Sequence, residues 1–254
     1  MTGHDEVLES KVPEITLWFW ITKILATTLG ETGGDAVSMS MHMGYLLSTG
    51  IFLIVFASAL VLQIRSRRFQ PAVYWVTIVA STTVGTTLAD YVDRSLGIGY
   101  AGGTALLAGL LMLSLLVWHT VTHSVDVRQI RDPRSEVFYW ITIMFSQTLG
   151  TALGDWTADS AGFGYLGGTG LFAGLLALVA LCLLFRGVSR VLLFWCAFVL
   201  TRPLGAVVGD FLDKPLAEGG LALSRIGASA VLMLLMLACV LLLPQRAARG
   251  VAAQ

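Results

Sequence analysis

Charged residues are scarce in this sequence of 254 residues. Only 13% of the residues are Asp, Glu, Lys or Arg, whereas 56% are hydrophobic, and 16 basic residues balance 16 acidic ones. About a quarter of the residues are charged in a typical soluble domain, so the composition predicts an integral membrane protein. The balanced charge also argues against the basic surface that binds nucleic acid, and we expect no nucleic-acid partner.

Cysteine is scarce as well. Cys182, Cys196 and Cys239 all lie in apolar runs, and neither a disulfide framework nor a zinc-site spacing is present. The polar, acidic start of the chain lacks the basic and apolar regions of a signal peptide, so we expect the first apolar segment to remain in the mature protein.

A repeat runs through the whole chain. Four segments align without a gap, and each begins with Trp and ends with Asp fifteen residues later: 20–35, 75–90, 140–155 and 195–210. Successive aspartates are 55, 65 and 55 residues apart, so the first and third copies are offset by 120, as are the second and fourth. This spacing indicates a two-copy unit that was itself duplicated.

Each repeat holds two apolar stretches, each long enough to cross ~30 Å of hydrocarbon as a helix of roughly 20 residues. We therefore predict one all-α membrane domain over 1–254, with eight transmembrane helices in four two-helix repeats. The repeats are expected at approximately 16–64, 71–118, 136–185 and 191–243.

Arginine concentrates after the second helix of each repeat. The residues concerned are Arg65, Arg67, Arg68, Arg128, Arg131, Arg134, Arg186, Arg190, Arg246 and Arg249. The positive-inside rule then places these loops and both termini in the cytoplasm. Four hairpins of the same orientation predict parallel repeats with pseudo-symmetry about the membrane normal.

The Trp-headed, two-helix unit resembles a family of bacterial membrane-anchored proteins built of four tandem repeats of unknown function. The repeat of that family has two transmembrane regions and a characteristic Trp, which Trp20, Trp75, Trp140 and Trp195 match. The resemblance covers nearly the whole chain and implies a multi-pass protein of the bacterial inner (cytoplasmic) membrane. It implies no particular activity.

The four repeated aspartates, Asp35, Asp90, Asp155 and Asp210, each end a polar stripe, to which Glu31 adds a fifth carboxylate. The stripe arises because residues four, seven and eight before each Asp share its helical face and are mostly polar. Such a stripe must face the bundle interior or a water-filled cavity, where carboxylates often mark ion pathways. We predict that these five residues bind a small cation, either a divalent metal or the proton of a coupled carrier. The alternative is structural: each Asp caps the next loop or pairs with a neighbouring helix.

Three cations, Lys23, Arg202 and Arg225, each occur in one repeat only and are expected to compensate charge. We expect Arg202 and Arg225 to neutralise Asp210 or a neighbour, and Lys23 to extend toward the cytoplasmic interface. Five carboxylates against three cations leave an excess of two, enough to hold one divalent cation or to carry protons. Because the charges differ between repeats, specialised sites are favoured over a uniform four-fold pore.

The four repeated tryptophans are expected to be interfacial anchors, because indole rings collect at the lipid headgroups. Small residues spaced four apart, such as Gly30 and Gly34, predict close helix packing. No catalytic triad order, zinc-protease motif or phosphate-binding glycine loop is present. We therefore predict no enzyme activity, no catalytic residues, and no cofactor apart from a divalent cation as substrate.

The favoured function is thus a small-cation transporter in contact with the lipid bilayer. A rival function is a membrane scaffold that transports nothing, whose Asp and Arg pairs are structural and whose arginine-rich loops contact anionic lipid or a partner.

Overall fold

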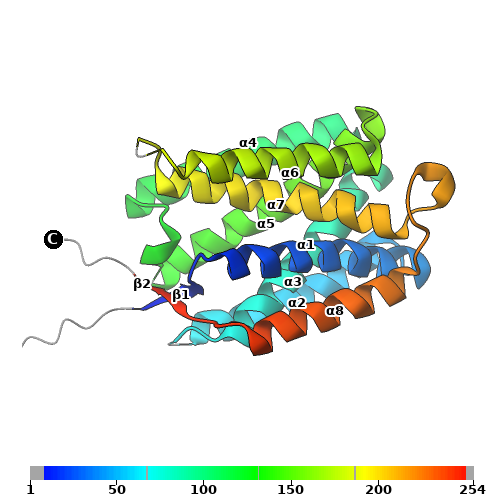
Figure 1. The fold of residues 1–254 in the computed structure, drawn as a ribbon. Helices are drawn as coiled ribbons and strands as arrows, with labels where there is room; N and C mark the ends of the chain where they lie inside the picture. The colour runs from blue at the N-terminus through cyan, green and yellow to red at the C-terminus, as the bar shows by residue number, and fades with distance from the viewer. Residues whose placement is uncertain (1–8, 67, 131, 186, 250–254) are drawn as a thin grey trace, which may run out of the picture.

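The chain folds as a bundle of long helices closed at one end by a small sheet. This computed structural model describes residues 9–249 with the exception of 67, 131 and 186. Within them lie eight α-helices: α1 (Leu17–Asp35), α2 (Tyr45–Arg65), α3 (Pro71–Asp90), α4 (Gly99–Thr122), α5 (Pro133–Asp155), α6 (Gly164–Cys182), α7 (Arg190–Asp213) and α8 (Arg225–Leu242) (Figure 1). Two short strands, β1 (Glu9–Pro13) and β2 (Ala247–Arg249), pair in antiparallel fashion.

Short helical segments join the long helices. A turn of π-helix continues α1, α3 and α5, at η1 (Ala36–Ser40), η2 (Tyr91–Ser95) and η4 (Trp156–Ser160). Turns of 3₁₀-helix lie before α5, at η3 (Val127–Gln129), and after α7, at η5 (Leu216–Glu218). The fourth repeat therefore differs from the others after its Asp, because α7 runs on as α-helix to Asp213.

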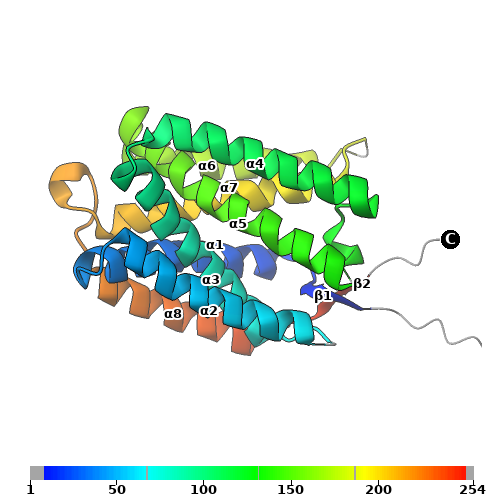
Figure 2. The ribbon, with the colours of Figure 1, turned by 180° about the vertical axis from the view of Figure 1, so that it is seen from behind.

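The first helices of the four repeats form a closed inner ring. In this ring α1 packs against α3 and α7, and α5 packs against the same two helices. Each second helix lies outside the ring, on the first helix of the following repeat: α2 on α3, α4 on α5, α6 on α7 (Figures 1 and 2). The last helix, α8, covers α1 and so joins the fourth repeat to the first.

Glycines allow the close approach of neighbouring ring helices. A Cβ on Gly30 would collide with the side chain of Thr82, and one on Gly205 would collide with Thr27. Thr82 Oγ1 also donates a hydrogen bond to the carbonyl oxygen of Ala26 on the neighbouring helix, at 3.3 Å. The close packing predicted from the small-residue spacing is confirmed at these contacts.

Apolar surface covers the outside of the bundle. Among the described residues, six helices are long and apolar enough to cross a membrane: α2, α3 with its π-turn, α4, α6, α7 and α8. The outer helices among them expose many large apolar side chains. The fold is therefore consistent with a multi-pass membrane protein. Helices α1 and α5 are more polar and lie within the ring.

The repeated tryptophans lie where the ring helices begin, and here the expectation of interfacial anchors needs correction. Trp75, Trp140 and Trp195 are only 2%, 1% and 5% exposed, and Trp20 is partly buried against Phe194. Trp75 Nε1 donates a hydrogen bond to Gln245 Oε1 at 3.1 Å. The rings of Trp75, Trp140 and Trp195 pack among the neighbouring helices and fill one end of the ring, whereas Trp20 stays partly exposed.

The small sheet lies at this aromatic end. Lys11 on β1 donates a hydrogen bond to the Ile64 carbonyl oxygen at 2.9 Å and pairs with the buried Glu136 at 2.6 Å. Ser10 Oγ donates to the Val127 carbonyl oxygen at 3.0 Å. The strand thus ties the N-terminal segment to α2, η3 and α5. Three of the arginines that follow the second helix of a repeat lie outside the described residues: Arg67, Arg131 and Arg186.

Candidate functional site

Residues four apart on each ring helix share a helical face, and one such face is buried inside the bundle. Four layers result, from the aromatic end to the opposite end: Lys23, Ile78, Ile143 and Phe198; then Thr27, Thr82, Gln147 and Arg202; then Glu31, Thr86, Thr151 and Ala206; then Asp35, Asp90, Asp155 and Asp210. Each of these residues is at most 3% exposed. The polar stripes predicted from the sequence therefore face the bundle interior.

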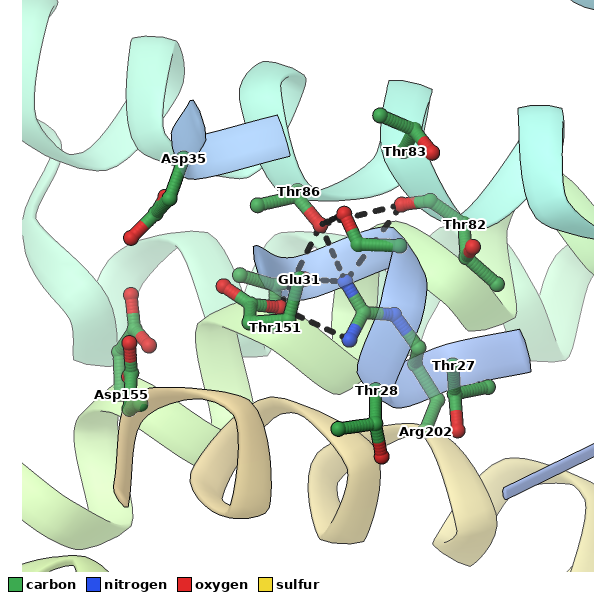
Figure 3. A network of polar contacts seen from close by, with 12 residues as sticks. Thr27, Thr28, Glu31, Asp35, Thr82, Thr83, Thr86, Thr151, Asp155 and Arg202 are labelled. Atoms are coloured by element: carbon green, nitrogen blue, oxygen red, sulfur yellow. Dashed lines mark hydrogen bonds and ion pairs between the residues drawn. The ribbon is translucent and has the colours of Figure 1, made fainter. Parts of the chain in front are cut away.

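Arg202 and Glu31 occupy the middle of the ring. Arg202 extends from α7, and its Nη1 atom lies 2.9 Å from Glu31 Oε2 on α1. Its Nη2 atom donates hydrogen bonds to Thr86 Oγ1 on α3, at 2.6 Å, and to Thr151 Oγ1 on α5 (Figure 3). Arg202 thus contacts the three other ring helices across the ring interior. Its carboxylate partner is Glu31, not Asp210.

The structure brings the four repeated aspartates together in two pairs, each bridged by one cation. Arg94 lies between the first pair, with Nε 3.0 Å from Asp90 Oδ1 and Nη2 3.3 Å from Asp155 Oδ2. Lys214 Nζ lies 3.1 Å from Asp210 Oδ1 and 3.3 Å from Asp35 Oδ2.

Two groups of three carboxylates have geometry suited to a metal ion. One oxygen each from Glu31, Asp155 and Asp210 lie within 4.8 Å of one another, and the same holds for Asp35, Asp210 and Asp213. Carboxylate oxygens are ligands that Mg²⁺ and Mn²⁺ prefer. Asp210 belongs to both groups and is therefore the centre of the candidate site.

Arg225, which the sequence analysis singled out, lies beside the group formed by Asp35, Asp210 and Asp213. Its Nε atom is 3.3 Å from Asp213 Oδ2 and 3.7 Å from Asp35 Oδ2. Asp213, which the sequence analysis did not single out, is buried in the last turn of α7.

Arg94 and Lys214 were also missed as partners of the repeated aspartates. Each follows a repeated Asp by four residues, Asp90 and Asp210, and this i, i+4 spacing was the available signal. Lys214 lies just beyond α7. Burial by itself would lower the pKa of Lys214, but the carboxylates of Asp210 and Asp35 outweigh that effect and raise the pKa above its usual value, so the ammonium stays charged.

The buried charges at this end do not balance. Six carboxylates converge here: Glu31, Asp35, Asp90, Asp155, Asp210 and Asp213. Four cations face them: Arg94, Arg202, Lys214 and Arg225. Within this group, six carboxyl groups against four cations leave an excess of two carboxyl groups. This count covers the carboxylates that the described ion pairs join; Asp93, which lies against Gly103 of α4, is not among them.

Contrary to the expectation from the sequence, Lys23 does not extend toward an interface. It is fully buried, and Nζ donates hydrogen bonds to Thr201 Oγ1 at 2.6 Å and to the Phe198 carbonyl oxygen at 3.2 Å. The ammonium also lies 3.7 Å from the centre of the Phe198 ring. Lys23 neither extends toward an interface nor pairs with a carboxylate in the described structure, because its position on α1 faces the ring.

Comparison with known proteins agrees with the repeat found in the sequence. The model of the family described as Repeat of Unknown Function (DUF347) matches four times, at residues 18–69, 73–124, 138–189 and 193–246. No curated protein and no solved structure matches the chain. Because the four matches cover most of the chain, the protein belongs to the DUF347 repeat family.

Proposed function

We propose that this protein is a small-cation transporter whose eight long helices all cross a membrane. The ring arrangement supports eight spans, because α1 and α5 are surrounded by other helices and their polar stripes face inward. Polar residues inside a membrane are tolerated in that position. The apolar outer surface would contact lipid.

The proposed orientation puts the aromatic end in the cytoplasm. Arg65, Arg128, Arg134, Arg190 and Arg246 lie in or beside the connections at that end, as do both strands. The positive-inside rule then favours cytoplasmic termini and parallel repeats about an axis along the membrane normal. The carboxylates would lie near the opposite face, in a bacterial cytoplasmic membrane.

The excess of two buried carboxylates is the observation that carries the proposal. Uncompensated charge is costly away from water, so these carboxylates favour binding of protons or of one divalent cation. The two groups of three carboxylates that share Asp210 are the proposed binding site for this cation. Under this proposal, passage of the cation toward the aromatic end requires Arg202 to leave Glu31.

Thermal unfolding of the detergent-purified protein tests the binding step. Mg²⁺, Mn²⁺, Na⁺ and K⁺ are added in turn at two pH values, since a cation that binds the folded state raises the Tm. We expect one cation to stabilise the parent but not the Asp155→Asn or Asp210→Asn variants. Asp126→Asn is the matched control, because Asp126 pairs with Arg128 at the aromatic end, at 2.7 Å, and should keep the response.

Uptake of the stabilising cation into vesicles containing the purified protein tests transport itself. The Asp155→Asn and Asp210→Asn variants should lose uptake, while Asp126→Asn should keep it. Equal uptake by all of these proteins would contradict the proposal.

A membrane scaffold without transport is the second candidate. It is supported by the ion pairs, since each of the four repeated aspartates already has a cation partner within 3.3 Å. This function predicts that the Asp→Asn variants lower the Tm while no cation raises the Tm of the parent.

A further inference from the structure

A groove lies on the outside of the ring, near the aromatic end. Helices α1, α6 and α7 form its walls, and residues of η3 and β2 close its end. Its volume is about 870 Å³, within the range of pockets that hold small ligands. The wall is largely apolar, with Ile24, Leu176, Ala180, Phe194 and Ala197 among the residues that line it.

Substitutions in the third repeat explain why the groove occurs here. Ala180 on α6 stands where the first two repeats have Leu60 and Leu115. Three residues later, Leu183 is 45% exposed, whereas the equivalent Trp118 of the second repeat is 1% exposed and packs on Trp195, with ring centres 5.8 Å apart. The side chains that fill this space on α4 are therefore absent from α6.

A second substitution makes the wall apolar. The ring helices of the first three repeats carry Thr22, Thr77 and Thr142 at one position, where α7 carries Ala197. Thr142 accepts a hydrogen bond from Ser114 on the helix outside it, at 3.2 Å. The equivalent of Ser114 on α6 is Val179, which also lines the groove. Both substitutions replace polar groups by apolar ones.

The mouth of the groove carries positive charge. Arg190 and Arg246 line it, and within residues 9–249, as far as they are described, neither forms an ion pair. Arg128 is also there but is already paired with Asp126. Glu14 is the remaining acidic residue at the mouth, so two arginines face one carboxylate.

We propose that this groove binds an anionic phospholipid, with an acyl chain along α7 and the phosphate at Arg190 and Arg246. From Arg190 to Thr201, which lines the deep end, the helix rises about 16 Å. That length matches half of the ~30 Å hydrocarbon core. Basic pockets between helices on the cytoplasmic side are a known form of acidic-lipid site, and guanidinium groups suit phosphate. The inference rests on the proposed membrane orientation, and it is independent of the cation site.

Native mass spectrometry of the full chain in detergent tests the proposal. Phosphatidylglycerol and phosphatidylcholine with identical acyl chains are added in separate titrations. We expect one phosphatidylglycerol to remain bound and phosphatidylcholine to bind at least tenfold more weakly. Arg190→Gln and Arg246→Gln should each weaken phosphatidylglycerol binding about fivefold. Arg68→Gln, at an exposed arginine outside the groove, should leave phosphatidylglycerol binding unchanged.

Substitutions that fill the groove provide a second test of lipid binding. Ala180→Leu restores the residue of the first two repeats and should abolish retention of the lipid. Ala173→Leu, at an exposed position of α6 outside the groove, should leave the lipid bound. Equal binding of the two lipids, or a folded Ala180→Leu that still binds phosphatidylglycerol as the parent does, would overturn the proposal. If Ala180→Leu fails to fold, the arginine variants decide. Stabilisation by cations should persist in Arg190→Gln, which separates this site from the carboxylates.

Discussion

Arg202 on α7 and Glu31 on α1 form an ion pair inside the ring, with Nη1 and Oε2 2.9 Å apart and both side chains almost fully buried. The other three repeats have Thr27, Thr82 and Gln147 at the position of Arg202, and Thr86, Thr151 and Ala206 at that of Glu31. The pair is thus a local departure from the repeat, made at the centre of the bundle.

Removing one partner of this pair should destabilise the protein strongly. Glu31→Thr leaves the Arg202 guanidinium without a counter-charge, and loss of one partner of a buried ion pair costs about 3–5 kcal/mol. The double variant Glu31→Thr with Arg202→Gln carries residues from other repeats at both positions and should recover much of that loss. Unfolding in detergent measures both effects. Additive losses in the double variant would contradict this account.

Removing Arg94 should strengthen cation binding. Arg94→Gln takes one positive charge from the Asp90 and Asp155 pair, and so raises the excess of carboxylates from two to three. The cation concentration that gives half of the full Tm shift should fall. Arg128→Gln, which removes a charge at the aromatic end, is the matched control and should not change it. An unchanged midpoint in Arg94→Gln would indicate that these carboxylates do not hold the cation.

A methyl group at the ring contacts should be poorly tolerated. Gly30→Ala places its Cβ against Thr82, and overpacking of this kind costs about 1–3 kcal/mol. Gly50→Ala is the matched control, because the position of a Cβ on Gly50 has no atom within 4 Å. It should be neutral or slightly stabilising, since Ala favours helix over Gly. Comparable Tm values for the two variants would argue against close helix contact at Gly30.

The buried tryptophans should contribute more to stability than an exposed one. Trp140→Ala empties space in the aromatic cluster, and such truncations cost about 3–5 kcal/mol. Trp18→Ala, at a residue that is 45% exposed on α1, should cost far less. Unfolding measurements on both variants separate the packing role found here from interfacial anchoring, which predicts a small loss at both positions.

The repeat made much of the architecture predictable. Its fixed spacing indicated helical hairpins, and the period of four placed the polar stripes on one face, toward the interior. The pairing of helices could not be predicted, because a small-residue stripe identifies a face but not the partner that packs on it. The packing of each outer helix on the following repeat, and of α8 on α1, therefore came only from the structure.

The candidate site was only partly predictable. The sequence identified the aspartates and Glu31, but whether they met depended on ring closure. Lys23 and the tryptophans were misjudged because distance from a helix end suggested an interface, while rotation about the helix axis decided burial. The cation partners Arg94 and Lys214 were not singled out from the sequence, although each is one helical turn from a repeated Asp.

Ring closure through α8 and α1 has a consequence for biosynthesis. Helix α1 is made before the other seven long helices, yet one of its ring neighbours, α7, and the helix that covers it, α8, belong to the fourth repeat. Until that repeat emerges from the ribosome, Glu31 lacks Arg202 and Asp35 lacks both Lys214 and Arg225. A nascent chain halted after the third repeat therefore holds acidic groups without their counter-ions, and assembly of the interior must wait for α7 and α8.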